Sequence, residues 1–276
     1  MSPRTYQVPQ LRNMLPVSGS TRASGPLVRA GDPAAEPVAA GDRLERLYAS
    51  LTADVLLAHA SGRKAIDLGY GSPEVTAWIR HRTGRHLSIV EKGALEADAS
   101  STPLREYAES DFDLAYCLRI FPHLGHDEES SERMARHVLE EAARVVRPGG
   151  IVAVEIANPR SLHGLRAGIR QPITVVARGT AMSSDESSLT RWETPGRLRE
   201  LAPESLLPES IHGMGIFLPT RRLLQIPLLG RALEGLEWWG RDRPFLQHFG
   251  RRLLVLLRKE RGPNATELRA APVVVG

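Results

Sequence analysis

The chain contains the segment Lys64-Ala-Ile-Asp-Leu-Gly-Tyr-Gly-Ser-Pro-Glu74, in which a short apolar run ends in an acid and two alternate glycines. Ser72 is typical of a helix N-cap, and Pro73 and Glu74 are typical of a first helical turn. The segment therefore predicts a strand that passes directly into a helix. Because glycine has no Cβ, the main chain of such a loop can lie against a ligand at the carboxyl edge of a parallel sheet.

The spacing of these glycines argues against a dinucleotide fingerprint. That fingerprint is G-x-G-x-x-G, and Glu74 stands where the third glycine is required. Asp67, which precedes Leu68 and Gly69, would also crowd a pyrophosphate. An acid at this position suits a positively charged ligand group better than a phosphate.

Length and charge bound the class of protein. A chain of 276 residues is long enough for one large domain, or for one domain with insertions and tails. The net charge of +4 and the pI of about 9.6 invite a nucleic-acid interpretation. Lysine occurs only at positions 64, 92 and 259, however, so the basicity comes almost entirely from arginine, which also pairs with carboxylates and covers apolar surface. No aromatic-studded basic strip is present, so we expect no nucleic-acid partner.

The single cysteine, Cys117, excludes an internal disulfide and disfavours a structural zinc site. It lies in an apolar run and is predicted to be inert packing. No stretch resembles a secretory leader or approaches the ~18 apolar residues of a membrane span, so we expect a cytoplasmic protein.

Apolar runs and helical periodicities alternate along the first half of the chain, which predicts an α/β fold with a doubly wound, mostly parallel sheet. The expected strands lie at 64–68, 86–91, 112–118 and 151–156, and the expected helices follow Asp42 and lie at about 73–83 and 129–146. Pro148-Gly149-Gly150 is predicted to turn sharply into the last of these strands.

Beyond Asn158 the pattern changes. Residues 159–190 are predicted to be loop-like, and the later elements are a helix at 194–203, a strand at 211–218, a helical segment at 220–243 and a strand at 251–258. Residues 1–41 and 261–276 are predicted to be disordered tails around one domain at 42–260.

Three motifs in order support a family assignment. Asp67-Leu-Gly-Tyr-Gly71 is similar to a D-x-G-x-G cofactor loop, Ala97-Asp98-Ala99 with Thr102-Pro103-Leu104 resembles an acidic segment beside an adenine, and Arg144-Val-Val-Arg-Pro-Gly-Gly150 resembles a turn into a fifth strand. On these motifs the chain resembles the class I S-adenosylmethionine-dependent methyltransferases, in the small-molecule branch that is similar to quinone-biosynthesis methyltransferases. The resemblance implies a Rossmann-like methyltransferase fold, S-adenosylmethionine as cofactor, and methyl transfer to oxygen or nitrogen of a small molecule.

The resemblance also implies cofactor-binding residues. In the first loop these are Asp67, Gly69, Tyr70 and Gly71: the main chain at the glycines lies against the cofactor, and Asp67 orders its ammonium through water or a neighbouring amide.

Two further acids are expected to bind the nucleoside. Glu91 follows Gly71 by 20 positions and can accept both ribose hydroxyls, while Asp98, followed by Ala99, can accept from the adenine amine. The alternative is that Glu91 and Asp98 are ordinary surface acids in a loop.

The chain departs from the family between these two acids. Only residues 92–97 separate Glu91 from Asp98, whereas a parallel crossover needs roughly a dozen residues or more. The third strand and its preceding helix are therefore expected to be missing. This departure supports an alternative function, a methyltransferase-like module that binds a ligand or partner without turnover.

His123 is the candidate catalytic base. It follows the strand that contains Asp113, and imidazole titrates near neutrality. The alternative is a histidine that caps a helix or meets solvent. His126 precedes the acidic run 127–129, but such a run is typical of a first helical turn, so no metal site is expected.

Residues 219–252 combine leucines and two tryptophans with arginines. This composition fits an interfacial helix at a membrane, and it fits equally a lid packed on its own domain. We favour a lid at about 219–248, which would shape a pocket for a hydrophobic or lipid-linked acceptor, and we keep peripheral membrane contact as the alternative. No pattern predicts an oligomeric state.

Overall fold

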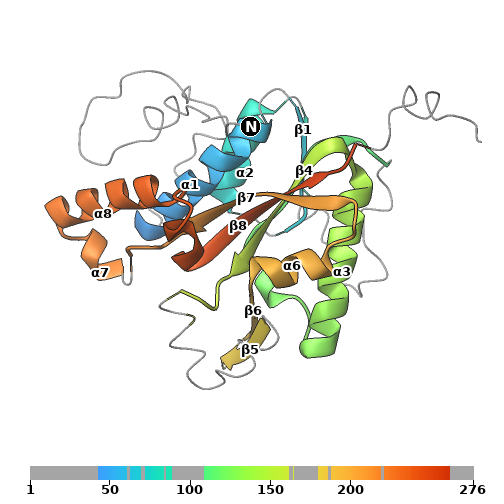
Figure 1. Cartoon of the computed structure of the whole chain (residues 1–276). Coiled ribbons are helices and arrows are strands. Elements are labelled where there is room, and N and C mark those ends of the chain that lie inside the picture. Colours follow the sequence, from blue (N-terminus) through green and yellow to red (C-terminus); the bar gives the residue numbers. More distant parts are fainter. Residues whose placement is uncertain are drawn as a thin grey trace, which may run out of the picture.

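The computed structural model describes residues 43–60, 63–69, 72–83, 85–88, 109–161, 164, 180–185, 188–218 and 221–261. An eight-stranded sheet lies between two helical layers in this part of the chain (Figure 1). The predicted tail at 1–41 lies outside the described residues, and so does the predicted tail at 261–276 except for residue 261.

The first half of the sheet is parallel, as predicted. Strand β1 (Lys64–Asp67) pairs in parallel with β2 (Arg85–Ser88) on one side and with β3 (Phe112–Cys117) on the other, and β3 pairs in parallel with β4 (Val146–Ala157). This arrangement confirms the Rossmann-like α/β fold. The predicted loss of a third strand falls on residues 89–108, which lie outside the described residues.

Antiparallel strands extend the sheet beyond β4. Strand β8 (Arg252–Lys259) pairs with β4 over residues 151–157, and β7 (Leu206–Met214) pairs with β8. The prediction placed β7 at 211–218, which is too late. The strand already begins at the fully buried Leu206, and a register shift between Pro208 and Ser210 interrupts the apolar pattern at its start.

The prediction of a loop over 159–190 is wrong at its end. Strands β5 (Thr180–Asp185) and β6 (Ser188–Glu193) form an antiparallel hairpin, and β6 joins β4 through the pair Ala157 and Trp192. The hairpin is rich in serine and threonine and contains no apolar run that would predict a strand. Its two strands are held together by main-chain hydrogen bonds.

The predicted sharp turn at 148–150 is also corrected. Strand β4 already begins at Val146, and the register shifts between Phe112 and Leu114 on its partner. Gly149 has a φ of 82°, a left-handed conformation that favours glycine. The glycines therefore form an irregularity inside the strand.

The helices lie where periodicity predicts them. Residues of α1 (Arg43–Ala60) and α2 (Pro73–Arg82) pack on one face of the sheet, and residues of α3 (Glu128–Val145) and α6 (Pro195–Leu201) pack on the other. The predicted segment 220–243 consists of α7 (Arg221–Leu224) and α8 (Pro227–Gly240). Short 3₁₀ turns η5 (Phe121–His123) and η6 (Leu246–Phe249) complete the set.

The acidic run at 127–129 starts α3. The side chain of Asp127 accepts from the Ser130 amide at 2.7 Å, and the amide of Asp127 donates to the Ser130 hydroxyl at 3.1 Å. This capping box confirms the first-turn interpretation. Among the described helices, none is both long and apolar enough to cross a bilayer.

Candidate functional site

The acid that ends β1 is bound by its own loop. Asp67 is 1% exposed; its Oδ1 accepts from the Gly69 amide at 3.0 Å, and its Oδ2 accepts from the Thr76 hydroxyl, on α2, at 3.0 Å. Burial raises the pKa of Asp67 to about 7, and these hydrogen bonds oppose the rise. The carboxyl group therefore holds the turn from β1 into α2.

Gly69 lies where a side chain would collide with the chain that follows β3. A Cβ built on Gly69 would lie 2.8 Å from Ile120 Cγ2 and 3.1 Å from the Leu118 carbonyl oxygen. The loops after β1 and β3 are therefore in contact at the carboxyl edge of the sheet. Tyr70 and Gly71, the other predicted residues of this loop, lie outside the described residues.

Helix α2 begins at the expected place. Ser72 occupies the N-cap position and Pro73 the first turn, but the Ser72 hydroxyl donates to Glu74 Oε2 at 2.5 Å instead of capping the helix. Ser72 is buried, so the start of the helix is closed against the neighbouring elements.

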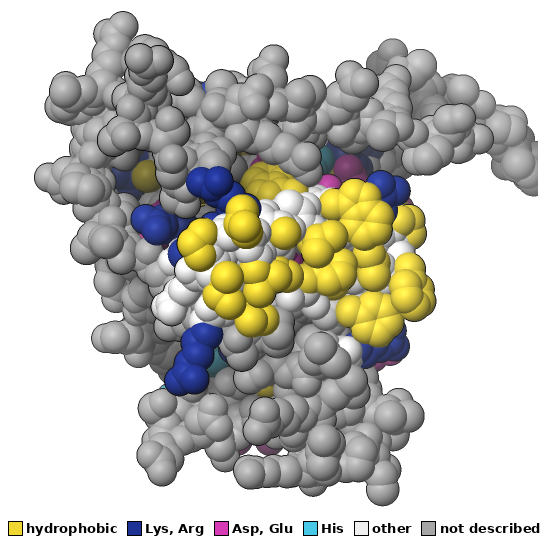
Figure 2. Space-filling model, turned by 90° about the vertical axis from the view of Figure 1, so that its left-hand side faces the viewer, with side chains coloured by type: hydrophobic (Ala, Val, Ile, Leu, Met, Phe, Trp, Pro, Cys, Tyr) yellow, Lys and Arg dark blue, Asp and Glu magenta, His cyan; other side chains and the backbone are white. Residues whose placement is uncertain are grey.

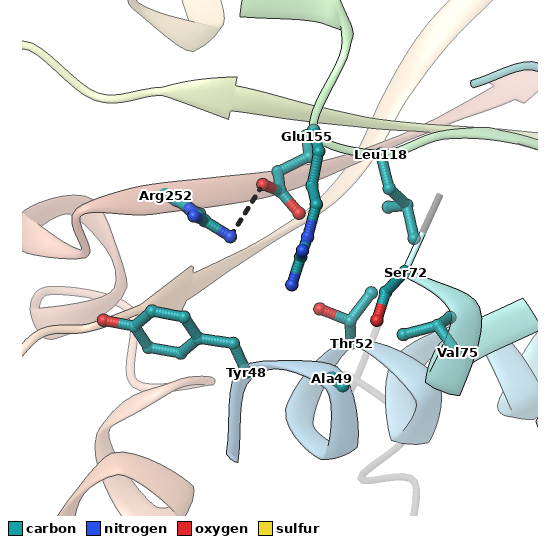
Figure 3. A pocket seen from close by; sticks show the side chains of 9 residues that line it. Tyr48, Ala49, Thr52, Ser72, Val75, Leu118, Glu155 and Arg252 are labelled. Atoms are coloured by element: carbon teal, nitrogen blue, oxygen red, sulfur yellow. Dashed lines mark ion pairs between the residues drawn. The ribbon is translucent and has the colours of Figure 1, made fainter. Parts of the chain in front are cut away.

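A small recess adjoins the loop after β1 (Figure 3). Its cavity volume is about 10 Å³, room for about one water molecule, and it is open to solvent. Helix α1, the start of α2, the loop after β3, and strands β4 and β8 all contribute to it. Its lining residues are Tyr48, Ala49, Thr52, Ser72, Val75, Leu118, Arg119, Glu155 and Arg252.

Opposite charges face each other in this recess. Glu155 on β4 is buried, and its Oε1 lies 3.4 Å from Arg252 Nη1 on β8, as the dashed line in Figure 3 marks. Burial raises the pKa of Glu155, while Arg252 and Arg119 oppose that rise. Arg119 also contacts Glu45, on α1, at 2.5 Å.

Two further lining residues have unusual features, one in its hydrogen bonding and one in its backbone conformation. Burial raises the pKa of Tyr48 to about 12, and its hydroxyl has no hydrogen-bond partner among the described residues. Arg119 adopts a φ of 63°, which is strained for a residue with a side chain. Strained backbone gathers at functional sites, which is consistent with a binding role for this edge of the sheet.

Sequence reasoning did not single out Tyr48, Glu155 or Arg252. Glu155 interrupts an otherwise apolar buried strand, and that interruption was the available signal. Arg252 and Tyr48 carry no comparable signal, because only the order of the strands brings them to Glu155.

His123 is not among the residues that line the recess. It ends η5, is exposed, and its Nδ1 lies 3.5 Å from the Thr190 hydroxyl oxygen on β6. The predicted nucleoside contacts Glu91, Asp98 and Ala99 lie outside the described residues. Within the described ranges, no three His, Cys, Asp or Glu side chains are grouped as metal ligands.

Comparison with known proteins agrees with the motifs. The family model of a methyltransferase domain matches residues 66–154. This match confirms the predicted resemblance, and it supports S-adenosylmethionine as the cofactor of a methyltransferase.

One curated relative is the methyltransferase GfsG of Streptomyces halstedii, which is 30% identical over 138 residues. The match covers 45% of this chain and 45% of GfsG, so it spans less than half the length of that relative.

Solved structures of methyltransferases are also similar. An S-adenosylmethionine-dependent methyltransferase from Mesorhizobium loti is 16% identical, with coverage of 75% of this chain and 96% of that one and a TM-score of 0.41. The 1,6-didemethyltoxoflavin-N1-methyltransferase of Burkholderia thailandensis, solved with S-adenosylhomocysteine, is 14% identical, with coverage of 78% and 77% and a TM-score of 0.43.

Proposed function

We propose, on the premise that residues 66–154 match a methyltransferase domain, that the protein transfers a methyl group from S-adenosylmethionine to oxygen or nitrogen of a small, apolar acceptor. One observation carries the proposal: at Gly69 the main chain turns without a side chain, in a loop held by the buried carboxyl group of Asp67. A bare main chain at the carboxyl edge of a parallel sheet is where this fold class binds nucleotide-like ligands.

The described residues fit this cofactor. Glycine at position 69 lets the loop after β1 lie directly against Leu118 and Ile120, where a Cβ would collide, and charged side chains line the adjoining recess. We propose that the remaining cofactor contacts are those expected from the sequence, namely Tyr70, Gly71, Glu91, Asp98 and Ala99.

We assign the recess to the amino-acid end of the cofactor. An amino-acid group carries an ammonium and a carboxylate side by side, and it therefore needs neighbouring charges of both signs. Glu155 and Arg252 offer such a pair 3.4 Å apart, and Arg119 adds a second cation. Charge-assisted hydrogen bonds to such groups are about twice as strong as neutral ones, which favours this orientation.

When bound, S-adenosylmethionine supplies a methyl group that its sulfonium already activates. The chain then has to orient the acceptor, exclude water and, for a hydroxyl or amine acceptor, remove a proton. We propose His123 as the group that takes this proton. Its position after β3 and its exposed imidazole would let it meet an acceptor that enters from solvent.

Residues 219–248 are proposed to act as a lid that shapes the acceptor pocket. Leu233 and Trp238 of α8 pack against the apolar core that α1 helps to form, so one side of α8 is packed on the rest of the domain. An apolar inner side favours an acceptor with hydrophobic or lipid-linked character. Peripheral membrane contact through 219–252 is the other part of this proposal.

Calorimetry tests the proposal. We expect S-adenosylmethionine and S-adenosylhomocysteine to bind, and NAD not to bind, because Glu74 replaces the third glycine of a dinucleotide loop. Absence of binding of both adenosyl ligands would rule out the methyltransferase function. Binding of both without consumption of S-adenosylmethionine across a panel of apolar phenols, amines and acids would instead favour the non-catalytic module.

A further inference from the structure

The outer side of the last helical segment exposes large apolar side chains. They lie on and around α8 and η6 and gather on one side of the molecule (Figure 2). Single exposed apolar residues are ordinary, whereas a cluster marks a contact surface. This apolar face consists of Ile226, Leu228, Leu229, Leu236, Trp239, Phe245 and Phe249, with Leu228 82% and Phe245 73% exposed.

Buried polar contacts hold this face outward. Glu237, on the inner side of α8, accepts from the amides of Gly215, Ile216 and Phe217 at 3.0, 3.1 and 2.6 Å. One turn later, Arg241 pairs with the buried Asp54, on α1, at 2.8 Å. Because these groups fix α8 about its own axis, the helix cannot rotate its leucines into the domain.

The charges around the face are unbalanced. The acids of this segment are engaged within the protein: Glu234 pairs with Arg43, Glu237 binds amides, and Asp242 pairs with Arg241. Three arginines of this segment have no such partner in the described part of the chain. Arg222, Arg231 and Arg243 are exposed and pair with no carboxylate among the described residues, and the Arg243 guanidinium lies 4.8 Å over the Trp239 ring.

We propose that the apolar face docks on an anionic lipid surface. An interfacial helix inserts leucine and tryptophan at the level of the headgroups while cations at its edge meet anionic lipid. Self-association through the same face fits less well, since a symmetric contact would bring the unpaired arginines of two copies together. The docking proposal rests on the proposed function in one respect: docking would bring a lipid-soluble acceptor to the methyl-transfer site. Binding of the apolar face to the lipid surface does not itself require catalysis.

Flotation with vesicles tests the docking. One set of vesicles contains only phosphatidylcholine, and the other also contains phosphatidylserine. We expect flotation with the anionic vesicles alone, weakening as salt is added. Leu228→Ser should lower the affinity about tenfold, by loss of inserted side-chain area, and Arg231→Gln about fivefold, by loss of one charge at the surface.

Two variants away from the face serve as controls. Leu207→Ser changes an exposed leucine on β7, and Arg133→Gln changes an exposed arginine on α3. Both should float like the unaltered protein. Calorimetry with S-adenosylhomocysteine on each variant separates the two proposals, because docking can fail while cofactor binding stays intact.

Three results would overturn the docking proposal. The first is no flotation with either vesicle, and the second is equal flotation with neutral and anionic vesicles. The third is a concentration-dependent dimer, seen by sedimentation, that Leu228→Ser dissociates, because a second copy would then be the occupant of the face.

Discussion

The amide of Gly69 donates to Oδ1 of Asp67 at 3.0 Å, so the acid that ends β1 closes the loop that follows it. The Thr76 hydroxyl binds the second oxygen and ties the same carboxyl group to α2. Strand, loop and helix thus share one buried acid. Gly69, at the start of the proposed cofactor loop, and Thr76 on α2 are thereby fixed by the two oxygens of one carboxyl group.

Gly69→Ala should damage both the fold and cofactor binding. The new Cβ would lie 2.8 Å from Ile120 Cγ2, and such overpacking costs about 1–3 kcal/mol. We expect a lower free energy of unfolding in urea and an affinity for S-adenosylhomocysteine reduced at least tenfold. Ile120→Ala in the same chain should restore part of the stability.

Gly235→Ala is the matched control for that variant. A Cβ at Gly235 would meet nothing within 4 Å, and the residue lies in an exposed part of α8. Alanine there should raise stability by up to about 1 kcal/mol through helix propensity. Equal losses in the two variants would show that close approach at Gly69 is not the cause.

Asp67 should make stability depend on pH. Burial raises its pKa in the folded protein from 3.8 to about 7, so the folded state binds more protons than the unfolded state between these values. The free energy of unfolding should therefore fall as pH rises through this window, by up to about 4 kcal/mol from this group. Asp67→Asn, which does not titrate at this position, should make this fall in stability smaller when it is measured by urea unfolding between the two values.

The control for the pH experiment is Asp111→Asn. Asp111 is a surface acid that pairs with Lys64 at 2.6 Å. This variant should keep the slope of the unaltered protein. If Asp67→Asn keeps that slope as well, Asp67 is not the titrating group.

Arg252→Gln should weaken binding of the amino-acid end of the cofactor selectively. Removal of the guanidinium takes away the cation beside Glu155. We expect the affinity for S-adenosylhomocysteine to fall about tenfold or more. The affinity for 5′-methylthioadenosine, which lacks the amino-acid end, should stay unchanged.

Arg258→Gln provides the comparison on the same strand. Arg258 lies at the other end of β8, where it pairs with Glu209. It should leave the affinities for both ligands unaltered. Equal weakening of the two ligands by Arg252→Gln would mean that the recess does not bind the amino-acid end.

Glu237→Gln should loosen the proposed lid. The carboxylate accepts from three main-chain amides, and hydrogen bonds to a charged group contribute about 1.5–3 kcal/mol each. We expect faster amide exchange at Gly215, Ile216 and Phe217 and a lower melting temperature. Glu234→Gln, which removes only a partly exposed ion pair with Arg43, should change exchange at these amides little. Unchanged exchange in Glu237→Gln would contradict the anchoring role.

The regular parts of the fold were predictable from the sequence because they follow local rules. Apolar spacing predicts α1 and α3, and the turn from β1 into α2 follows from its glycine, serine and proline. The hairpin of β5 and β6 escaped prediction because its pairing is between main-chain groups and its side chains are mostly polar. The early start of β7 was missed for a related reason, since polar residues separate Leu206 from the rest of its apolar pattern.

The recess was the least predictable part of the site. Glu155 and Arg252 are far apart in sequence and meet only because β8 runs antiparallel beside β4. Tyr48 joins them from α1, which packs on the same face of the sheet. The spacing of residues along the sequence does not predict which distant strands pair. Asp67 and Gly69, in contrast, are two positions apart in one recognisable loop.

The most direct test of the central claim is the position of S-adenosylhomocysteine in a crystal of the complex. We predict that the ligand lies against the main chain at Gly69, with its amino-acid end toward Arg252 and Glu155. Density at another place, or a loop closed by the protein's own atoms at saturating ligand, would contradict the assignment of this site.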